Sequence, residues 1–85
     1  MRRISPLYKL PLGRKGTVTE IAAKGALRRR MQDLGIIDGT SVKVLLKSPS
    51  GDPKAYQIRG AVVALRSEDA SKIMAEYDIH TVEVM

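Results

Sequence analysis

The stretch TSVKVLLKSPSGDPKAYQIRGAVVAL, residues 40–65, decides the fold of this chain. Its first part alternates apolar side chains with lysine, and the inward positions would be Val42, Val44 and Leu46. Alternation with a period of two residues is typical of a strand with one buried face. Residues 40–47 are therefore predicted to form a half-buried strand.

A turn and two more strands follow within the same stretch. Residues 48–53 are dense in serine, proline, glycine and aspartate, which predicts a turn. Residues 56–59 alternate again, and after Gly60 residues 61–65 form a short continuous apolar run. Such a run is typical of a strand in the middle of a sheet. Three closely spaced strands with glycine and proline turns indicate a mainly β chain.

Upstream of this stretch the sequence predicts one more strand and one helix. Residues 17–21 are rich in β-branched side chains, but the apolar Val18 and Ile21 lie three positions apart, so we expect a strand with a β-bulge. Residues 26–34 repeat with helical spacing, and Gly35 follows where a left-handed cap would end the helix. The apolar face of this helix comprises Leu27, Met31 and Leu34.

Downstream, the pattern predicts a second short helix and a closing strand. Residues 67–69 combine a cap residue with two acids, and apolar side chains continue to Tyr77 at helical spacing. Residues 80–84 alternate and predict the last strand. Many short strands in so small a chain favour a partly open barrel of about five strands, with one inserted α-helix and a short second helix before the last strand. We expect one domain over residues 1–85, with its core at about 7–84.

The composition excludes several classes of protein. The chain has 85 residues and no cysteine, so disulfides, thiolate metal sites and thiol catalysis are excluded. Its longest apolar run, Ala61–Leu65, falls far short of the ~20 residues that span a bilayer. No apolar stretch follows the basic residues at the start, as a secretory signal would require. We therefore expect a cytoplasmic protein.

The net charge of +6 is unevenly distributed along the chain. Residues 1–30 hold nine basic residues and one acid, a balance of +8, whereas residues 31–85 hold six basic residues and eight acids, a balance of −2. Such a basic half is suited to an acidic protein surface or to nucleic acid. Three tyrosines, without phenylalanine or tryptophan, offer few stacking platforms, so nucleic acid is the less favoured partner. The candidate partner-binding residues are Arg28, Arg29 and Arg30 on the helix and Arg14 and Lys15 in the turn before the first strand.

The residue types present give little support to a catalytic or metal site. A nucleophile needs a base within hydrogen-bond reach, and the only histidine, His80, falls near the C-terminus on the apolar face of the last predicted strand. The segment Gly13-Arg14-Lys15-Gly16 lacks the spacing of a phosphate-binding loop. Zinc or iron would need three or four ligands, and one histidine without cysteine leaves mostly oxygen donors. We expect no enzyme, no cofactor and no intrinsic metal site, the ligand count leaving open only weak binding of Fe(II) or Zn(II).

Three sequence blocks together carry a family resemblance. They are Leu34-Gly35-Ile36 with Gly39; Ser48-Pro49-Ser50-Gly51-Asp52-Pro53 followed by Tyr56-Gln57-Ile58-Arg59-Gly60; and Ala64-Leu65-Arg66 with Asp69-Ala70. In this order and spacing they closely resemble the FeoA family, small bacterial cytosolic proteins that accompany the FeoB ferrous-iron transporter. The same blocks occur more loosely in the C-terminal domain of iron-dependent repressors. One departure is Asp38, where the family often has proline before the glycine.

The resemblance implies an SH3-like barrel and an accessory or regulatory role in ferrous iron uptake. The implied partner is the cytosolic region of FeoB, its G domain, and the membrane would be reached only through FeoB. It implies no catalytic residue. The residues expected to define the fold rather than to touch the partner are Gly35, Gly39, Gly51, Asp52, Pro53, Gly60, Leu65 and Arg66.

Two other functions stay open at this point. One is a small basic β-barrel that binds nucleic acid through the basic half of the chain. The other is a metal-responsive accessory domain like that of the iron-dependent repressors. Those repressors carry a DNA-binding region ahead of the barrel, and six residues before Leu7 are too few for one. An accessory protein that binds FeoB is therefore the leading hypothesis.

Overall fold

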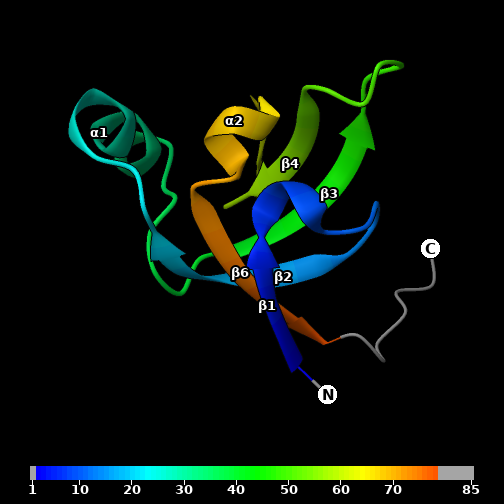
Figure 1. Cartoon of the computed structure of the whole chain (residues 1–85), viewed down its shortest axis with the longest axis horizontal. Helices are drawn as coiled ribbons and strands as arrows, with labels where there is room; N and C mark the ends of the chain where they lie inside the picture. The colour runs from blue at the N-terminus through cyan, green and yellow to red at the C-terminus, as the bar shows by residue number, and fades with distance from the viewer. Residues whose placement is uncertain (1, 79–85) are drawn as a thin grey trace.

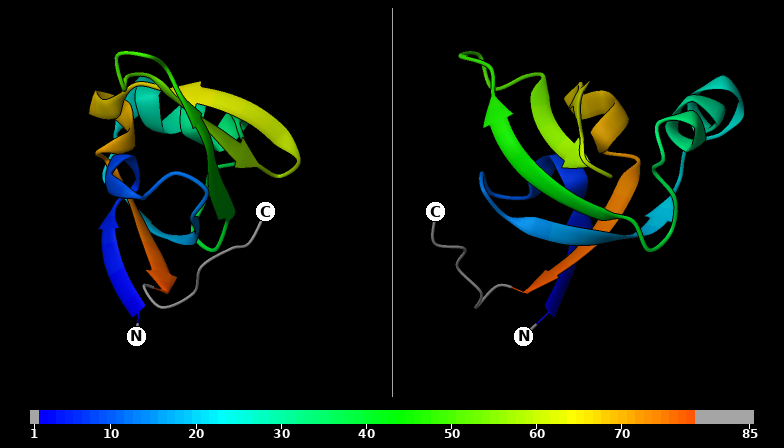
Figure 2. Two further views of the ribbon diagram at one scale, coloured as in Figure 1. Left: turned by 90° about the vertical axis from the view of Figure 1, so that its right-hand side faces the viewer. Right: turned by 180° about the vertical axis from the view of Figure 1, so that it is seen from behind.

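The computed structural model describes residues 2–78 and shows one antiparallel sheet of six strands in the order β1-β6-β2-β3-β4-β5. The strands are β1 (Arg2–Pro6), β2 (Lys15–Ile21), β3 (Ser41–Lys47), β4 (Lys54–Ile58), β5 (Ala61–Leu65) and β6 (Ile73–Asp78). The helices are α1 (Gly25–Asp33), α2 (Ser67–Ala70) and the 3-10 helix η1 (Leu7–Lys9). The sheet is strongly curved, with α1 at one end of the molecule and the β3–β4 loop at the other (Figures 1 and 2). The prediction of a mainly β, partly open architecture is confirmed, with six strands in place of about five.

The core is built from alternate positions of the strands and from one face of α1. Because successive side chains of a strand point to opposite faces, burial at every second residue places one face inside. The buried strand positions include Val42 and Val44 of β3, Ile58 of β4, and Ile73 and Ala75 of β6. Leu7 and Leu10, in and after η1, are also fully buried and close the core from the side of α2.

Helix α1 confirms the helix predicted over residues 26–34, displaced by one residue. Met31 is buried, and the other two predicted apolar positions pack against the core. At the end of the helix, the N–H of Gly35 donates to the carbonyl of Gln32 at 2.9 Å, and the N–H of Ile36 donates to the carbonyl of Met31 at 2.9 Å. These two bonds form a Schellman motif, whose left-handed residue is Gly35 with φ +85°.

The sheet contains two bulges, of which the sequence predicted one. In β2 the register with β6 shifts between Val18 and Glu20, which confirms the bulge expected there. In β3 a second shift lies between Val44 and Leu46. One extra residue turns each later side chain to the opposite face. Leu46 is consequently 66% exposed, and the prediction that it points inward is wrong.

Strand β5 lies at an edge of the sheet, so the prediction that residues 61–65 run through its middle is wrong. Within residues 2–78 it pairs with β4 alone, through a turn of two residues, Arg59 and Gly60. Their φ angles of +52° and +80° fit the type I′ turn that closes tight hairpins. Val62 is 66% exposed on this edge. A short apolar run therefore identified the strand here but not its position in the sheet.

The short second helix predicted from Ser67 is confirmed as α2, but the helical spacing read beyond Ala70 belongs to a strand. Helix α2 ends at Ala70, and the following residues form β6, which pairs with β1 on one side and β2 on the other. Residues 70–77 have apolar positions that suit helical spacing, but Ile73 and Ala75 also alternate, and pairing with two neighbouring strands decides between the two. Strand β1 was not predicted, and the strand predicted at 80–84 lies outside the described residues.

Candidate partner-binding surfaces

The segment at Gly35 is tied to the β4–β5 turn by a side-chain bond to its backbone. The carbonyl of Gly35 accepts a hydrogen bond from Arg59 Nε at 3.1 Å and another from Thr40 Oγ1 at 3.1 Å. A Cβ atom at Gly35 would stand 2.7 Å from Arg59 Cδ, so the side chain of Arg59 lies directly over this glycine. The end of α1 is therefore fixed to the β4–β5 turn, which positions the helix relative to the sheet.

A second tie joins the β3–β4 loop to the start of α2. The carboxylate of Asp52 accepts the backbone N–H of Ser67 at 2.8 Å and the Ser67 hydroxyl at 3.1 Å. A carboxylate that accepts the first N–H groups of a helix satisfies donors that have no partner within the helix. Leu65 is buried just before this contact, while Arg66 is exposed. The Asp52–Pro53 peptide bond is cis.

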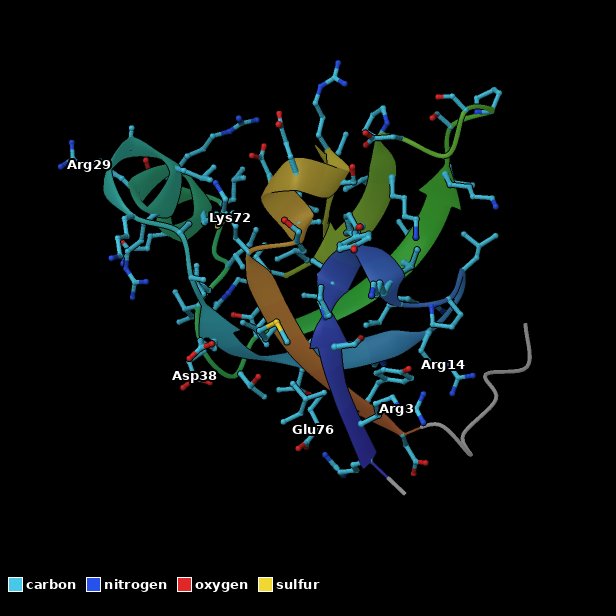
Figure 3. All side chains as sticks on the ribbon, in the orientation of Figure 1. Arg3, Arg14, Arg29, Asp38, Lys72 and Glu76 are labelled. Carbon is cyan, nitrogen blue, oxygen red and sulfur yellow. The ribbon has the colours of Figure 1, made fainter. Side chains whose placement is uncertain are left out.

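Helix α1 presents a basic outer face, here termed the α1 face and defined by Arg28, Arg29 and Arg30. All three side chains are exposed, and Arg29 points away from the rest of the molecule (Figure 3). Arg28 Nη1 donates to the carbonyl of Ile21 at 3.0 Å, which ties this arginine to the end of β2. Within the described part of the chain, no hydrogen bond or ion pair is formed by the side chains of Arg29 and Arg30. Their guanidinium groups are solvated and accessible to a partner.

The structure separates Arg14 and Lys15 from the α1 face. Figure 3 shows Arg14 and Arg29 at opposite ends of the molecule. Arg14 Nη1 donates to the carbonyl of Asp78 at 2.6 Å, and its guanidinium lies 5.8 Å from the centre of the Tyr77 ring. Lys15 is exposed beside it. The five predicted partner-binding residues therefore form two separate basic surfaces, and the arginine of the second is occupied by contacts within the chain.

A third surface escaped the sequence analysis. Lys54 Nζ donates to the backbone carbonyl of Tyr8 at 2.5 Å and so bridges β4 and η1. A hollow of about 460 Å³ at this bridge has a lining that includes Lys9 and Lys47, and another of about 240 Å³ has a lining that includes Tyr56. Tyr8 and Lys54 line both hollows. The two adjoining hollows are termed the Tyr8 groove.

Tyr56, which lines the smaller hollow, carries a buried hydroxyl group without a partner among residues 2–78. The side chain of Tyr56 is 0% exposed, and its Oη atom has no hydrogen-bond partner among residues 2–78. Burial raises the pKa of the Tyr56 phenol to about 12, and the negative charge of Asp52 adds to the shift. The hydroxyl is therefore protonated at any physiological pH and available as a hydrogen-bond donor. A buried polar group without a partner costs about 1–3 kcal/mol, so its persistence calls for a reason.

No sequence pattern marks the Tyr8 groove, because its residues come from separate segments. Tyr8 and Lys54 stand 46 positions apart and meet only in the folded chain. Lysines at positions 9, 47 and 54 show no spacing that predicts a shared surface. A signal was present only in Tyr56, a polar aromatic at an inward position of a predicted strand.

Among the described residues, no three His, Cys, Asp or Glu side chains are grouped as metal ligands would be. No helix within residues 2–78 is both long and apolar enough to cross a membrane. His80, discussed above as an isolated histidine, lies outside that part of the chain.

Comparison with known proteins relates nearly the whole chain to one family. The FeoA domain family matches residues 5–77. A curated relative from Porphyromonas gingivalis, an Fe(2+) transport protein A/Fe(2+) transporter FeoB fusion protein, is 33% identical over 70 residues. That match covers 82% of this chain but only 8% of the relative, so the chain corresponds to a small segment of the fusion protein.

Solved structures agree with this relationship. An FeoA-like protein from Clostridium acetobutylicum has 30% identity and a TM-score of 0.85, covering 99% of this chain and 98% of its own. FeoA from Stenotrophomonas maltophilia, described as a prokaryotic SH3 domain protein complexed with zinc, has 29% identity and a TM-score of 0.70, covering 81% and 86%. A manganese-dependent transcriptional repressor shares the fold, with 24% identity and a TM-score of 0.80 over 91% of this chain and 43% of the repressor. The SH3-like fold expected from the sequence is confirmed.

Proposed function

Because this chain belongs to the FeoA family, which is associated with ferrous iron transport, we propose that it is an accessory protein that binds the cytosolic G domain of FeoB. The observation that carries the proposal is the Porphyromonas gingivalis relative, in which an FeoA segment and FeoB share one chain. Fusion raises the effective concentration of two modules and favours contacts that are weak between separate proteins. In this proposal the contact lies on the cytoplasmic side of the membrane.

The α1 face supplies the contact in this proposal. Arginine is enriched at protein interfaces because its guanidinium group donates several hydrogen bonds in a fixed geometry. Arg29 and Arg30 are exposed, and beside the helix Ile37 is an exposed apolar side chain, 43% accessible. A basic surface with an apolar neighbour fits an acidic surface on a partner. The α1 face therefore combines charge attraction with some apolar area to bury.

The role is one of binding, not catalysis. Arg28, Arg29 and Arg30 are cations that attract a partner but cannot act as a nucleophile or general base at neutral pH, since arginine stays protonated. Two of the blocks that characterise the chain have structural contacts: the backbone of Gly35 caps a helix, and the carboxylate of Asp52 anchors a loop to the start of α2. We propose that these blocks hold the α1 face in place and that the α1 face contacts FeoB.

The test is a calorimetric titration of the full chain with the purified cytosolic region of FeoB from the same organism. The variant Arg29→Glu/Arg30→Glu leaves the Arg28 bond to Ile21 intact and should weaken binding at least tenfold. The matched control Arg3→Glu/Arg66→Glu makes the same charge change at exposed positions elsewhere, and its affinity for FeoB should stay within twofold of that of the unaltered chain. Absence of binding by the unaltered chain would refute FeoB as partner. Equal losses in both variants would instead show a general charge effect and reject the α1 face.

A further inference from the structure

We propose that the Tyr8 groove is a second binding site, distinct from the α1 face, that takes an extended acidic peptide segment. One backbone carbonyl of the peptide would accept the hydroxyl hydrogen of Tyr56. Acidic side chains next to it in the peptide would lie against Lys9 and Lys47. The proposal does not depend on FeoB being the partner of the α1 face.

The first observation in favour is the unpartnered hydroxyl of Tyr56. It belongs to a fully buried side chain that lines the smaller hollow, and no described residue accepts its hydrogen. Phenylalanine would fill the same core position without this cost, since it differs only by the hydroxyl group. An acceptor that enters the hollow and reaches this donor would gain a hydrogen bond and remove the cost of the unpartnered hydroxyl.

The second observation is the charge of the larger hollow. Among residues 2–78, its lining includes three lysines and no acid. Lys54 uses one of its three N–H groups on the Tyr8 carbonyl and retains two donors. Lys9 and Lys47 are exposed, with Lys9 Nζ 5.9 Å from the centre of the Tyr8 ring. This concentration of positive charge selects an anionic ligand.

The two hollows require different chemistry, and a peptide supplies both kinds. Asp52 lies near Tyr56 and would repel a carboxylate placed at the hydroxyl. A neutral carbonyl is therefore the better acceptor at Tyr56. Carboxylates are favoured in the larger hollow, whose charged lining residues among residues 2–78 are all lysines. A ligand that carries neutral carbonyls and carboxylates along one extended line is an acidic peptide.

The groove also offers apolar contacts between its polar points. The ring of Tyr8 borders both hollows, and Leu12, which is 57% exposed, borders the larger one. η1, which carries Tyr8, packs against α2, and this contact holds the Tyr8 wall of the groove to the fold (Figure 1). Lys9 and Lys47 are already exposed, whereas the buried Tyr56 hydroxyl is reached only when the side chains over it move aside for the peptide carbonyl.

The experiment selects binders of the full, immobilised chain from a phage-displayed library of random 12-residue peptides. We expect the enriched peptides to contain more Asp and Glu than the starting library. The most enriched peptide, synthesised with capped ends, is then titrated by fluorescence polarisation. Lys9→Glu/Lys47→Glu should weaken the affinity for this peptide more than tenfold. Tyr56→Phe should weaken it about fivefold, as expected for the loss of one hydrogen bond. The charge-matched control Arg3→Glu/Arg66→Glu should change it less than twofold.

Several results would overturn the proposal. One is selection of peptides without acidic enrichment. Another is an acidic peptide whose affinity is unaffected by Tyr56→Phe and by Lys9→Glu/Lys47→Glu. A third is loss of peptide binding in Arg29→Glu/Arg30→Glu, which would place the peptide on the α1 face. Tighter binding of a 12-nucleotide thymidine strand, lost in the same groove variants, would assign the groove to nucleic acid instead.

Discussion

The α1 face and the Tyr8 groove are both cationic, yet they are built in opposite ways. The α1 face has three consecutive arginines on one exposed helix. The Tyr8 groove gathers lysines from three separate segments around a buried hydroxyl that has no partner within residues 2–78. Exposed charges attract over a distance but are solvated and weakly oriented, whereas a buried donor acts only on an atom placed in contact with it. The first surface is suited to attracting a partner and the second to holding one.

This difference predicts that the Tyr8 groove, unlike the α1 face, is linked to the stability of the core through a titrating group. Burial raises the pKa of the Tyr56 phenol to about 12 in the folded chain, from 10.0 for an exposed tyrosine. Because the folded chain holds the phenol proton more tightly than the unfolded chain, its free energy of unfolding is unaffected below pH 10 and falls as the pH rises through 10 and past 12. The difference between the two pKa values corresponds to a total loss of about 3 kcal/mol once the phenol is ionised in both states.

Urea unfolding at pH 9 and pH 12, compared between the unaltered chain and Tyr56→Phe, measures this linkage. All other titrations cancel in the comparison. We expect the unaltered chain to lose about 2 kcal/mol more than Tyr56→Phe between the two pH values, because at pH 12 the phenol is only half ionised in the folded chain. An equal loss would show that the hydroxyl is not buried in solution, and the contrast between the two surfaces would disappear.

The second prediction separates the surfaces through Gly35, which positions α1 but lies away from the Tyr8 groove. Gly35→Ala introduces a side chain at φ +85° and displaces Arg59, whose Nε bonds the Gly35 carbonyl. We expect a loss of about 2 kcal/mol in thermal unfolding, a fall in Tm of about 8–16 °C. FeoB binding should weaken while the affinity of the groove peptide stays the same.

Gly39→Ala is the matched control for this substitution. Its φ of +90° imposes the same backbone strain, but no atom stands within 4 Å of the new Cβ. The expected loss is about 1 kcal/mol. If Gly39→Ala were as destabilising as Gly35→Ala, the contact with Arg59 would contribute nothing to the position of α1.

The third prediction concerns rates of binding. Charges on the α1 face should act mainly on association, because they attract an acidic partner before contact is made. Arg29→Glu/Arg30→Glu should lower the association rate with the FeoB cytosolic region about tenfold and leave its dissociation rate nearly unchanged. Tyr56→Phe should instead raise the dissociation rate of the groove peptide about fivefold. Surface plasmon resonance at two salt concentrations distinguishes these effects, and a reversed pattern would contradict the roles assigned to the two surfaces.

The sequence predicted those parts of the fold that depend on neighbouring residues and missed those that depend on contacts between distant segments. The helix at 26–34 was predicted to within one residue, because its apolar spacing and its Gly35 cap both act within a few residues along the chain. Residues 73–78 fit a period of two as well as helical spacing, and only their pairing with β1 and β2 makes them a strand. Leu46 turned outward because of a bulge that no local pattern indicates.

The candidate sites, too, could be predicted only where their residues are neighbours in the sequence. Arg28, Arg29 and Arg30 are consecutive, so the sequence revealed them directly. Arg14 and Lys15 were grouped with them by charge alone, and the structure places Arg14 at the opposite end of the molecule (Figure 3). The Tyr8 groove depends on contacts between distant segments, such as the bond from Lys54 to the Tyr8 carbonyl, and sequence patterns do not encode such contacts individually.

The smallest expected effect is also the most specific to the Tyr8 groove. At pH 7 the Tyr56 hydroxyl is buried without a partner among the described residues, so Tyr56→Phe should stabilise the isolated chain by about 1 kcal/mol while weakening its affinity for the groove peptide. Thermal unfolding with and without the peptide measures both effects. Tyr77→Phe, at a half-buried ring beside Arg14, is the control and should show neither. A tyrosine retained only for packing would predict no loss of affinity, and a hydroxyl bonded within the chain would predict destabilisation. Greater stability together with weaker binding is expected only when a residue is kept for a ligand at the expense of the fold.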